Sequence, residues 1–343
     1  MYTAGDLRRR RAAVRAALPG RQPHAVPGEA RAFASANIAL VKYWGKRDEA
    51  LHLPRTGSLS VSLGPWGSEA TLALTRKAAE VWLDGEKLAP GSSFAARALA
   101  YLELFRPESG ENFVLKTRNT LPTAAGFASS ASGFAAIAKA LDALFGWDLP
   151  ERNLSVLARL GSGSAARSLR DGFVEWKCGR KADGSDSYAV ALPVAWKTLR
   201  IGAVVVERAR KPLSSGEAMR RCIATSPFMA AWDKTVRGDL RAAKEAVAKR
   251  DLRALGEVAE GNALAMHAVM LAARESVFYP TGASLAALAK VRQLRAEGVP
   301  VYATMDAGPN VKLLFEAKSE SPVRRAFPDA VVLCPFADKG SRR

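Results

Sequence analysis

A segment of small residues that runs directly into a helical pattern constrains the fold most. Residues 122–133 read PTAAGFASSASG, and residues 134–146 read FAAIAKALDALFG, with apolar positions at helical spacing up to Gly146. Small side chains let backbone N–H groups approach an anion, and a helix start adds partial positive charge. The segment therefore predicts a phosphate-binding turn, although close helix packing or helix capping by Ser129 and Ser130 explains it about as well.

The segment does not match the two commonest nucleotide-binding motifs. It lacks the GK[ST] ending of a P-loop, and no dinucleotide fingerprint follows a strand anywhere in the chain. At 343 residues, the chain is also longer than one compact domain usually is. Strand and helix patterns alternate on both sides of a crossover near residues 189–201, so we predict an α+β protein with two domains.

The predicted strands of the first half lie within residues 31–74, in a hairpin around Asp84-Gly85, and at 111–119, 172–179. Its predicted helices cover residues 94–105, 134–146 and 151–160. In the second half we predict a strand at 200–207, helices through 274 and at 283–298, and three strands within 299–334, with helices on one face of an antiparallel sheet. The predicted boundaries are a basic extension at 1–28 and domains at 29–195 and 196–343.

The charge of the chain needs a separate explanation, because the formal net charge is +18. The first 31 residues are rich in arginine, but the chain has no RNP motif, zinc-finger spacing or basic zipper, so a nucleic-acid-associated protein is a remote alternative. We expect a basic helix from Asp6 to Leu18, ended by Pro19-Gly20, as a surface appendage rather than a targeting signal. No apolar run reaches the roughly 20 residues of a membrane helix, so we expect no membrane partner.

Cysteine and histidine suggest neither a disulfide framework nor a metal centre. The three cysteines are far apart and odd in number, which fits a reducing cytoplasm. The three histidines have no metal-ligand spacing, so we predict no metal site built from protein side chains. His267, beside Met266 in a helical pattern, is predicted to be a packed residue.

Three further segments could bind or transform an anion. Residues 162–167 read SGSAAR and combine two hydroxyls, a glycine and an arginine fork, residues 42–47 read KYWGKR, and residues 305–310 read MDAGPN. Each has an ordinary explanation: a capped turn with a surface arginine, a solvated strand edge, and a turn before proline. Only their combination points to a site.

Together, ASANIALVKYWGKRD, LPTAAGFASSASGFAA, GSGSAARSL with GFVEW, and YATMDAGPN resemble the diphosphomevalonate decarboxylases of the GHMP kinase superfamily, in the same order over about residues 32 to 316. The resemblance implies a ribosomal protein S5 domain 2-like N-terminal domain and a ferredoxin-like C-terminal domain, with the active site between them. It also implies ATP and Mg²⁺ as cofactors, a phosphorylated mevalonate as substrate, and a homodimer.

The resemblance also implies roles for individual residues. Asp306 corresponds to the catalytic carboxylate, supported by Lys42 and Asn37, while Arg167 holds the substrate carboxylate. The residues implied to bind substrate are Tyr43, Trp44, Gly45, Lys46, Ser162, Gly163, Ser164, Ala165, Ala166, Arg167, Ser214 and Ser215. The residues implied to wrap the ATP phosphates are Ala125, Gly126, Ala128, Ser129 and Ser130.

The implied reaction phosphorylates the tertiary 3-hydroxyl of diphosphomevalonate and then expels phosphate and carbon dioxide to form isopentenyl diphosphate. Departures from the family pattern at Thr56-Gly57 and Glu275-Ser276 leave two alternatives open. One is the same chemistry on 5-phosphomevalonate, and the other is phosphorylation without decarboxylation, as in a mevalonate 3-kinase. The presence of both Lys42 and Asp306 favours decarboxylation, because relatives that only phosphorylate tend to lack this pair.

Overall fold

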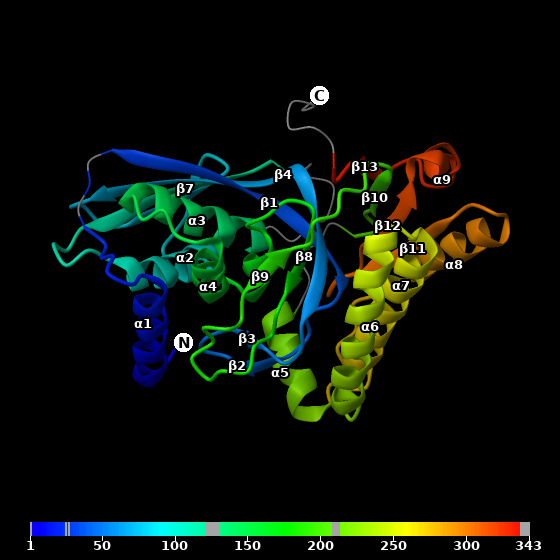
Figure 1. Cartoon of the computed structure of the whole chain (residues 1–343), viewed down its shortest axis with the longest axis horizontal. Helices are drawn as coiled ribbons and strands as arrows, with labels where there is room; N and C mark the ends of the chain where they lie inside the picture. Colours follow the sequence, from blue (N-terminus) through cyan, green and yellow to red (C-terminus); the bar gives the residue numbers. More distant parts are fainter. Residues whose placement is uncertain (1, 25, 27, 121–129, 208–212, 337–343) are drawn as a thin grey trace.

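The computed structural model describes the chain except residues 1, 25, 27, 121–129, 208–212 and 337–343. It is an α+β protein with two main sheets, which Figure 1 shows in the two halves of the molecule. The described part of the first half forms a seven-stranded sheet in the order β6-β5-β7-β4-β8-β9, with β1 paired to β4. Its strands are β1 (Glu29–Val41), β4 (Ser58–Thr75), β5 (Glu80–Leu83), β6 (Glu86–Lys87), β7 (Asn112–Asn119), β8 (Phe173–Trp176) and β9 (Ala189–Ala191).

Side chains along these strands alternate between a face that packs in the core and a face exposed to solvent. Phe113 and Leu115 on β7 point into the first core, which also contains residues of the helices of this half. On the other face Glu69 of β4 pairs with Arg31 at 2.6 Å and with Arg118 at 2.9 Å. The helices are α2 (Ser93–Leu102), a short 3-10 turn (Glu103–Phe105), α3 (Ser130–Phe145) and α4 (Glu151–Gly161).

The second half contains a four-stranded antiparallel sheet in the order β11-β12-β10-β13. Its strands are β10 (Leu199–Val204), β11 (Val301–Met305), β12 (Val311–Glu316) and β13 (Val331–Leu333). Its helices are α5 (Ser215–Thr225), α6 (Met229–Lys249), α7 (Leu252–Leu271), α8 (Gly282–Ala296), a 3-10 turn (Ala317–Ser319) and α9 (Glu320–Ala326). Strand membership changes between β9 and β10, which supports our proposed domain division after residue 195.

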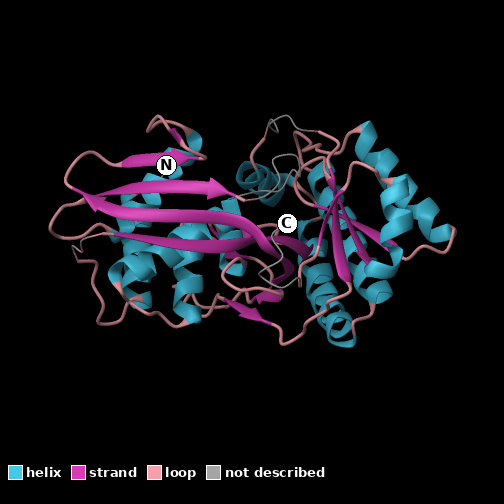
Figure 2. Cartoon of the chain, turned by 90° about the horizontal axis from the view of Figure 1, so that it is seen from above, coloured by secondary structure: helices cyan, strands magenta, loops and turns pink. Residues whose placement is uncertain are grey.

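The prediction that helices cover only one face of this second sheet is wrong. Val301 and Met305 pack in one cluster with Val291 of α8, whereas Tyr302 belongs to the cluster formed with α7. A Cβ on Gly256 of α7 would come within 2.1 Å of the Tyr302 ring, so this helix lies directly on the sheet. Figure 2 shows helices on both sides of the second sheet. Both faces of the sheet are apolar, so helices pack on each of them and exclude water.

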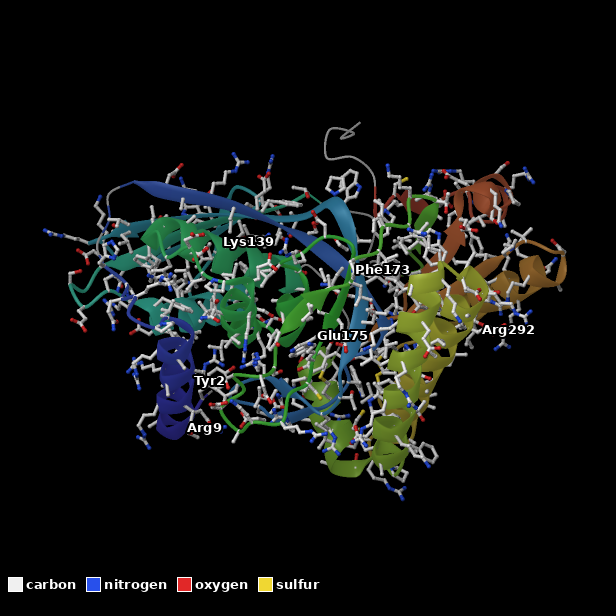
Figure 3. The ribbon with its side chains drawn as sticks, viewed as in Figure 1. Tyr2, Arg9, Lys139, Phe173, Glu175 and Arg292 are labelled. Carbon is white, nitrogen blue, oxygen red and sulfur yellow. The ribbon has the colours of Figure 1, made fainter. Side chains whose placement is uncertain are left out.

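Contacts from α6 join the two halves. The Trp232 indole N–H donates to the carbonyl of Trp44 at 2.9 Å, and both rings are buried in the second core. Lys244 pairs at 3.1 Å with Glu175 on β8, which Figure 3 labels beside α6. This core contains residues of β1 and β4 as well as of β10 and α7. The second half is thus packed against the strands that lead into the predicted site.

The N-terminal segment forms the expected helix but is not a surface appendage, so that part of the prediction is wrong. Helix α1 (Ala4–Ala17) begins with a capping box in which Thr3 and Asp6 exchange hydrogen bonds. Its inward face recurs at helical spacing and joins the first core. The buried residues of this face are Arg10, Ala13, Val14 and Ala17.

Sequence patterns also missed short elements. Strands β2 (Lys46–Asp48) and β3 (Leu53–Pro54) form a small hairpin, and residues 163–167 form a 3-10 turn. Two or three residues are too few to show a period, so these elements form only because tertiary contacts hold them. The predicted longer helices and the Asp84-Gly85 hairpin are confirmed, with ends shifted by a few residues.

Candidate active site

The centre of the site is an ion pair between the two halves of the chain. Lys42 follows β1, and Asp306 follows β11 in the turn before β12. The Lys42 Nζ lies 2.9 Å from Asp306 Oδ1. Lys42 exposes 2% of its side chain and Asp306 exposes 38%, so the lysine is buried beneath a carboxylate that still reaches solvent. The predicted meeting of these two residues is confirmed.

Lys42 is held by groups that sequence reasoning did not identify. Its Nζ donates to the Ala39 carbonyl at 2.7 Å, and its backbone N–H donates to Asn262 Oδ1 at 2.7 Å. Asn262 lies on α7 and donates in turn to Asp239. Asn37, predicted to support Lys42 and Asp306, instead donates to Ser168 Oγ at 2.7 Å, next to Arg167. Asn37 is thus hydrogen-bonded to the residue that follows the arginine, and its support of Lys42 and Asp306 stays a prediction.

A second buried lysine was missed. Lys312 on β12 is 4% exposed, and its Nζ lies 3.8 Å from Asp306 Oδ2. Burial raises the pKa of the Asp306 carboxyl, but the charges of Lys42 and Lys312 outweigh this effect and hold that pKa well below its usual value. Asp306 is therefore ionised at every physiological pH. The signal in the sequence was a single lysine within the apolar run VKLLF.

His267 lies behind the carboxylate rather than in a metal site. One ring nitrogen, Nε2, is 3.1 Å from the backbone carbonyl of Asp306. Burial, together with the charge of Lys42, lowers the pKa of His267 to about 4, so the ring is neutral at pH 7. Its tautomer with a proton on Nε2 can donate to that carbonyl and fix the turn. The prediction of a packed histidine is confirmed.

Arg167 supplies the third buried cation of the site. It is 3% exposed, donates from Nη1 to Ser58 Oγ, and lies 5.9 Å from the centre of the Trp176 ring. Burial lowers the pKa of Arg167 to about 10, while the nearby charge of Asp306 opposes this shift. The guanidinium therefore stays charged. Its buried Nε has no hydrogen-bond partner within the described residues, which leaves one donor for a ligand.

The predicted turn at 162–167 lies against the Tyr43 ring. A Cβ on Gly163 would come within 2.8 Å of the Tyr43 hydroxyl, so only glycine fits there. The hydroxyls of Ser162 and Ser164 are 3.4 Å apart and half-buried. The Tyr43 hydroxyl is buried and lacks a hydrogen-bond partner in the part of the chain that is described. These groups form a set of donors that face one another across the turn.

Three predicted substrate-binding residues have buried apolar side chains. Trp44 is 1% exposed in the second core, and Ala165 and Ala166 are 0% and 1% exposed. Trp44 packs in the second core and Ala165 in the first, so the contribution of these positions to binding stays a prediction. Their burial follows from the apolar character of the residues, because burying an indole or a methyl group is favourable.

Gly45 and Lys46 lie at the start of the small hairpin. Gly45 has φ +105°, a conformation that favours glycine, and an added Cβ would come within 2.9 Å of the Arg55 side chain. Lys46 on β2 has a side chain that is 10% exposed, and its Nζ pairs with Glu49 at 2.7 Å. An anionic ligand could compete with this carboxylate for the lysine.

The remaining predicted residues are only partly accounted for. Ser214 caps α5 by accepting from the Glu217 N–H at 3.2 Å, and Ser215 is the first residue of that helix. Ser130 begins α3, so its position at a helix N-terminus agrees with the predicted anion site. Four predicted phosphate-loop residues lie outside the described residues: Ala125, Gly126, Ala128 and Ser129.

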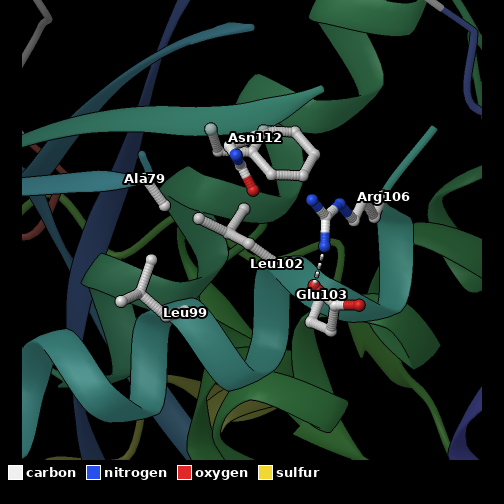
Figure 4. A pocket seen from close by; sticks show the side chains of 7 residues that line it. Ala79, Leu99, Leu102, Glu103, Arg106 and Asn112 are labelled. Carbon is white, nitrogen blue, oxygen red and sulfur yellow. Dashed lines mark ion pairs between the residues drawn. The ribbon is translucent and has the colours of Figure 1, made fainter. Parts of the chain in front are cut away.

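A pocket away from these residues has different chemistry. A pocket of about 120 Å³ lies between the end of α2 and β7, and it is lined mainly by Leu99, Leu102 and Asn112 with the Glu103–Arg106 ion pair at 3.6 Å (Figure 4). None of the predicted site residues lines it. No group of three or more metal-ligating side chains occurs in the described ranges. None of the described helices is long and apolar enough to span a bilayer.

The chemistry of the central group follows from its charges. A permanently ionised carboxylate sits among two buried lysines and a buried arginine, beside a turn with two hydroxyls and a phenol. Such a group can hold a polyanionic ligand and place one negative charge against a reacting atom. The buried cations are preorganised and need little rearrangement when charge develops.

Comparisons with known proteins agree with this arrangement. Residues 34–189 match the diphosphomevalonate decarboxylase-like N-terminal domain, and residues 201–334 match the mevalonate 5-diphosphate decarboxylase C-terminal domain. A diphosphomevalonate decarboxylase of Gibberella zeae is 35% identical over 323 residues, which are 87% of this chain and 84% of that protein. The Saccharomyces cerevisiae diphosphomevalonate decarboxylase is 33% identical over 310 residues, 84% of this chain and 78% of that protein.

Solved structures of mevalonate diphosphate decarboxylases are also similar to this chain. Mevalonate diphosphate decarboxylase from Staphylococcus aureus superposes with a TM-score of 0.84 at 36% identity, over 89% of this chain and 95% of that one. A protein described as MDDEF in complex with MVAPP, AMPPCP and magnesium also has a TM-score of 0.84, at 37% identity, over 89% of this chain and 96% of that one. The chain belongs to the diphosphomevalonate decarboxylase family.

Proposed function

We propose that the chain catalyses the ATP-dependent decarboxylation of (R)-5-diphosphomevalonate to isopentenyl diphosphate, ADP, phosphate and carbon dioxide, in the mevalonate pathway of isoprenoid biosynthesis. The observation that carries the proposal is the Asp306 carboxylate, which is held by Lys42 and Lys312 beside Arg167. Family membership and the match to a structure with MVAPP and AMPPCP support it.

Asp306 would act on the 3-hydroxyl of the substrate. An alcohol is a poor leaving group and phosphate a good one, so transfer of the ATP γ-phosphoryl activates the C3 oxygen. The low pKa of Asp306 makes it a weak base, and its main task is then to orient the hydroxyl for a loose phosphoryl transfer. When the C3–O bond breaks, positive charge develops at C3, and the fixed carboxylate stabilises it.

Arg167 and the turn beside it would hold the anionic ends of the substrate. The guanidinium fork suits a carboxylate, and it would keep this group aligned with the breaking C3–O bond until carbon dioxide leaves. Tyr43, Ser162 and Ser164 would donate to phosphate oxygens, together with the ammonium group of Lys46. Each of these groups is a donor, as a diphosphate requires.

The residues present fit a magnesium ion that is held mainly by nucleotide oxygens. Mg²⁺ usually takes one or two carboxylates together with substrate phosphates, and Asp306 is a partly exposed carboxylate in this site. Asp306 would contribute one carboxylate oxygen to the ion, and the nucleotide would supply the others. When bound, Mg²⁺ supplies neutralising charge to the phosphate oxygens of ATP.

A product assay tests the proposal directly. Purified protein is incubated with ATP, Mg²⁺ and either diphosphomevalonate, 5-phosphomevalonate or mevalonate, while ADP and carbon dioxide are both quantified. Diphosphomevalonate should give equal amounts of ADP and carbon dioxide and should have the highest kcat/KM. ADP without carbon dioxide would overturn decarboxylation, and a preference for 5-phosphomevalonate would reassign the substrate.

The pH profile of Lys42→Met should differ from that of the wild type on the acidic side. Without this charge, only Lys312 and Arg167 still oppose the effect of burial, so the pKa of Asp306 should be higher than in the wild type and the active carboxylate should be lost at a higher pH as pH falls. Wild-type kcat should stay constant down to roughly pH 5. In Lys42→Met, Asp306 should already be partly protonated at that pH, so its kcat should fall. Measurement of kcat from pH 4.5 to 8 checks this.

Lys244→Met is the matched control for that experiment, because Lys244 also pairs with a carboxylate between the halves but is not an ion-pair partner of Asp306. Its profile should follow the wild type. If Lys42→Met and the wild type had superimposable profiles, Lys42 would not be controlling the ionisation of Asp306.

We also propose that the enzyme is a cytoplasmic homodimer. Three large apolar side chains are exposed where α6 begins and α7 ends, namely Phe228 at 50%, Leu271 at 42% and Phe278 at 62%, and such a patch supports an interface. All three cysteines are free, which supports a reducing compartment. Sedimentation equilibrium of the purified protein measures the assembly state.

A further inference from the structure

The N-terminal helix reaches the substrate side of the molecule. Helix α1 lies before residue 34, where the match to the family begins. Arg10 on this helix is only 2% exposed, and its guanidinium donates from Nη1 to the Ala50 carbonyl at 2.6 Å and from Nη2 to the Leu160 carbonyl at 2.7 Å. One buried fork thus bridges two segments that are far apart in sequence.

Both bridged segments carry predicted substrate-binding groups. Ala50 lies in the turn of the β2–β3 hairpin, which begins with Lys46. Leu160 is in the last turn of α4, two residues before Ser162 and the turn that ends with Arg167. The position of Arg10 therefore affects where the lysine and the hydroxyl-arginine turn lie relative to each other.

A second contact from the N-terminus reinforces the first. Tyr2 and His52 are 3.0 Å apart between Oη and Nε2, and His52 Nδ1 is 2.9 Å from the Arg159 carbonyl. A carbonyl can only accept, so Nδ1 carries the proton and Nε2 accepts from the Tyr2 hydroxyl. Burial, with the charges of Lys46 and Arg10, holds the pKa of His52 well below its usual value, which keeps this neutral tautomer.

The outer edge of the hairpin is held from the same helix. Arg9 pairs with Asp48, and Asp48 Oδ1 accepts from the Leu51 N–H at 2.8 Å, which closes the turn of the hairpin. The Arg10 guanidinium also stacks on the Tyr2 ring, 4.2 Å from its centre. Figure 3 labels Tyr2 and Arg9 in this region of the molecule. Contacts from Tyr2, Arg9 and Arg10 thus converge on one hairpin.

We propose that α1 is a positioning element of the substrate site, in which Arg10 ties the β2–β3 hairpin to the end of α4 so that Lys46 and the 162–167 turn grip the same diphosphate. The inference rests on the proposed function, because it assigns these groups to the diphosphate of the substrate. Arg10 is a positioning residue, since it acts through carbonyls and not on the substrate.

The test separates substrate positioning from stability. Arg10→Met keeps the length of the side chain but removes both donors, and Tyr2→Phe removes one hydroxyl near the chain end and is the milder variant. Arg10→Met should raise the KM for diphosphomevalonate about 10-fold, because a small displacement of binding groups weakens their grip. The KM for ATP should not change. Tyr2→Phe should raise the KM for diphosphomevalonate about 2- to 3-fold, as the loss of one neutral hydrogen bond predicts.

A control and a double-mutant cycle complete the experiment. Arg15→Met removes an exposed arginine of the same helix and should leave both KM values unchanged. If Arg10 acts through Lys46, the effects of Arg10→Met and Lys46→Met on KM should be less than multiplicative when combined. A merely structural role would lower the melting temperature and the active fraction while leaving KM unchanged, and that result would overturn the inference.

The outcomes also separate this inference from the proposed function. If the wild type and Arg15→Met release carbon dioxide from diphosphomevalonate while Arg10→Met and Tyr2→Phe keep the wild-type KM, only the positioning role fails. If the wild type releases no carbon dioxide from this substrate, the proposed function fails and the inference fails with it. If Arg10→Met does not fold, the KM of Tyr2→Phe for diphosphomevalonate tests the inference instead, and a wild-type value overturns it.

Discussion

Asp306→Asn should lower kcat about 10³-fold while the KM for ATP stays within about 2-fold of the wild type, as expected when a group acts mainly in the transition state. The substitution keeps the size of the side chain but removes its negative charge. Lys42 and Lys312 would then be buried without the charge that both of them face. Developing positive charge at C3 would no longer be offset. Steady-state kinetics with diphosphomevalonate measures the effect.

Glu320→Gln is the matched control for Asp306→Asn. Glu320 is a partly exposed carboxylate of the same half that pairs with Arg200 at 3.1 Å and with Arg324 at 2.8 Å, away from the site. Its removal should leave kcat unchanged. Thermal melting of both variants shows whether they are folded. A folded Asp306→Asn protein with a normal rate would contradict the role of this carboxylate.

Arg167→Lys should lower kcat/KM for diphosphomevalonate about 10²-fold, even though it keeps the positive charge, because an ammonium group cannot reproduce a bidentate fork. The native guanidinium is fixed by Ser58 and the Trp176 ring, and its buried Nε has no partner among the residues that the structure describes. A flexible lysine would hold the substrate carboxylate less well. Phosphorylation should then outpace decarboxylation, so that the ratio of ADP to carbon dioxide rises above one.

Arg253→Lys tests whether the same substitution at an arginine outside the predicted site has this effect. Arg253 is exposed on α7 and pairs with Glu257 one turn later, at 3.0 Å. Its replacement should leave kcat/KM and the product ratio unchanged. A fully active Arg167→Lys enzyme with an equal yield of ADP and carbon dioxide would show that only charge, and not the guanidinium fork, is required at this position.

Local patterns were sufficient to predict most elements of the fold. Helix α3 was predicted from its apolar spacing and Gly146, and the hairpin of β5 and β6 from Asp84-Gly85. Sequence patterns did not predict elements that are too short to show a period, and they did not predict burial that depends on neighbouring elements. The strands of the second sheet have nearly continuous burial, so alternation could not show that α8 and α7 cover opposite faces.

Sequence motifs predicted only some residues of the candidate site. Asp306, Lys42 and Arg167 stand in recognisable motifs, and the structure places the first two in contact. Lys312 and Asn262 lie in a strand and a helix with no motif around them, and only packing brings them to the site. Trp44 was included because it stands within the KYWGK motif, although its apolar ring is buried.

The sequence alone determined the types and order of the longer elements, the four motifs and the chemical identity of the site residues. These properties depend on neighbouring residues, whose spacing decides which faces are apolar and which backbone groups are free. Tertiary structure decided which charges meet. Lys42 and Asp306 are 264 positions apart, and Arg10 and Leu160 are 150 positions apart. Such contacts form only when the cores pack, because no local pattern records which distant residue a buried cation will face.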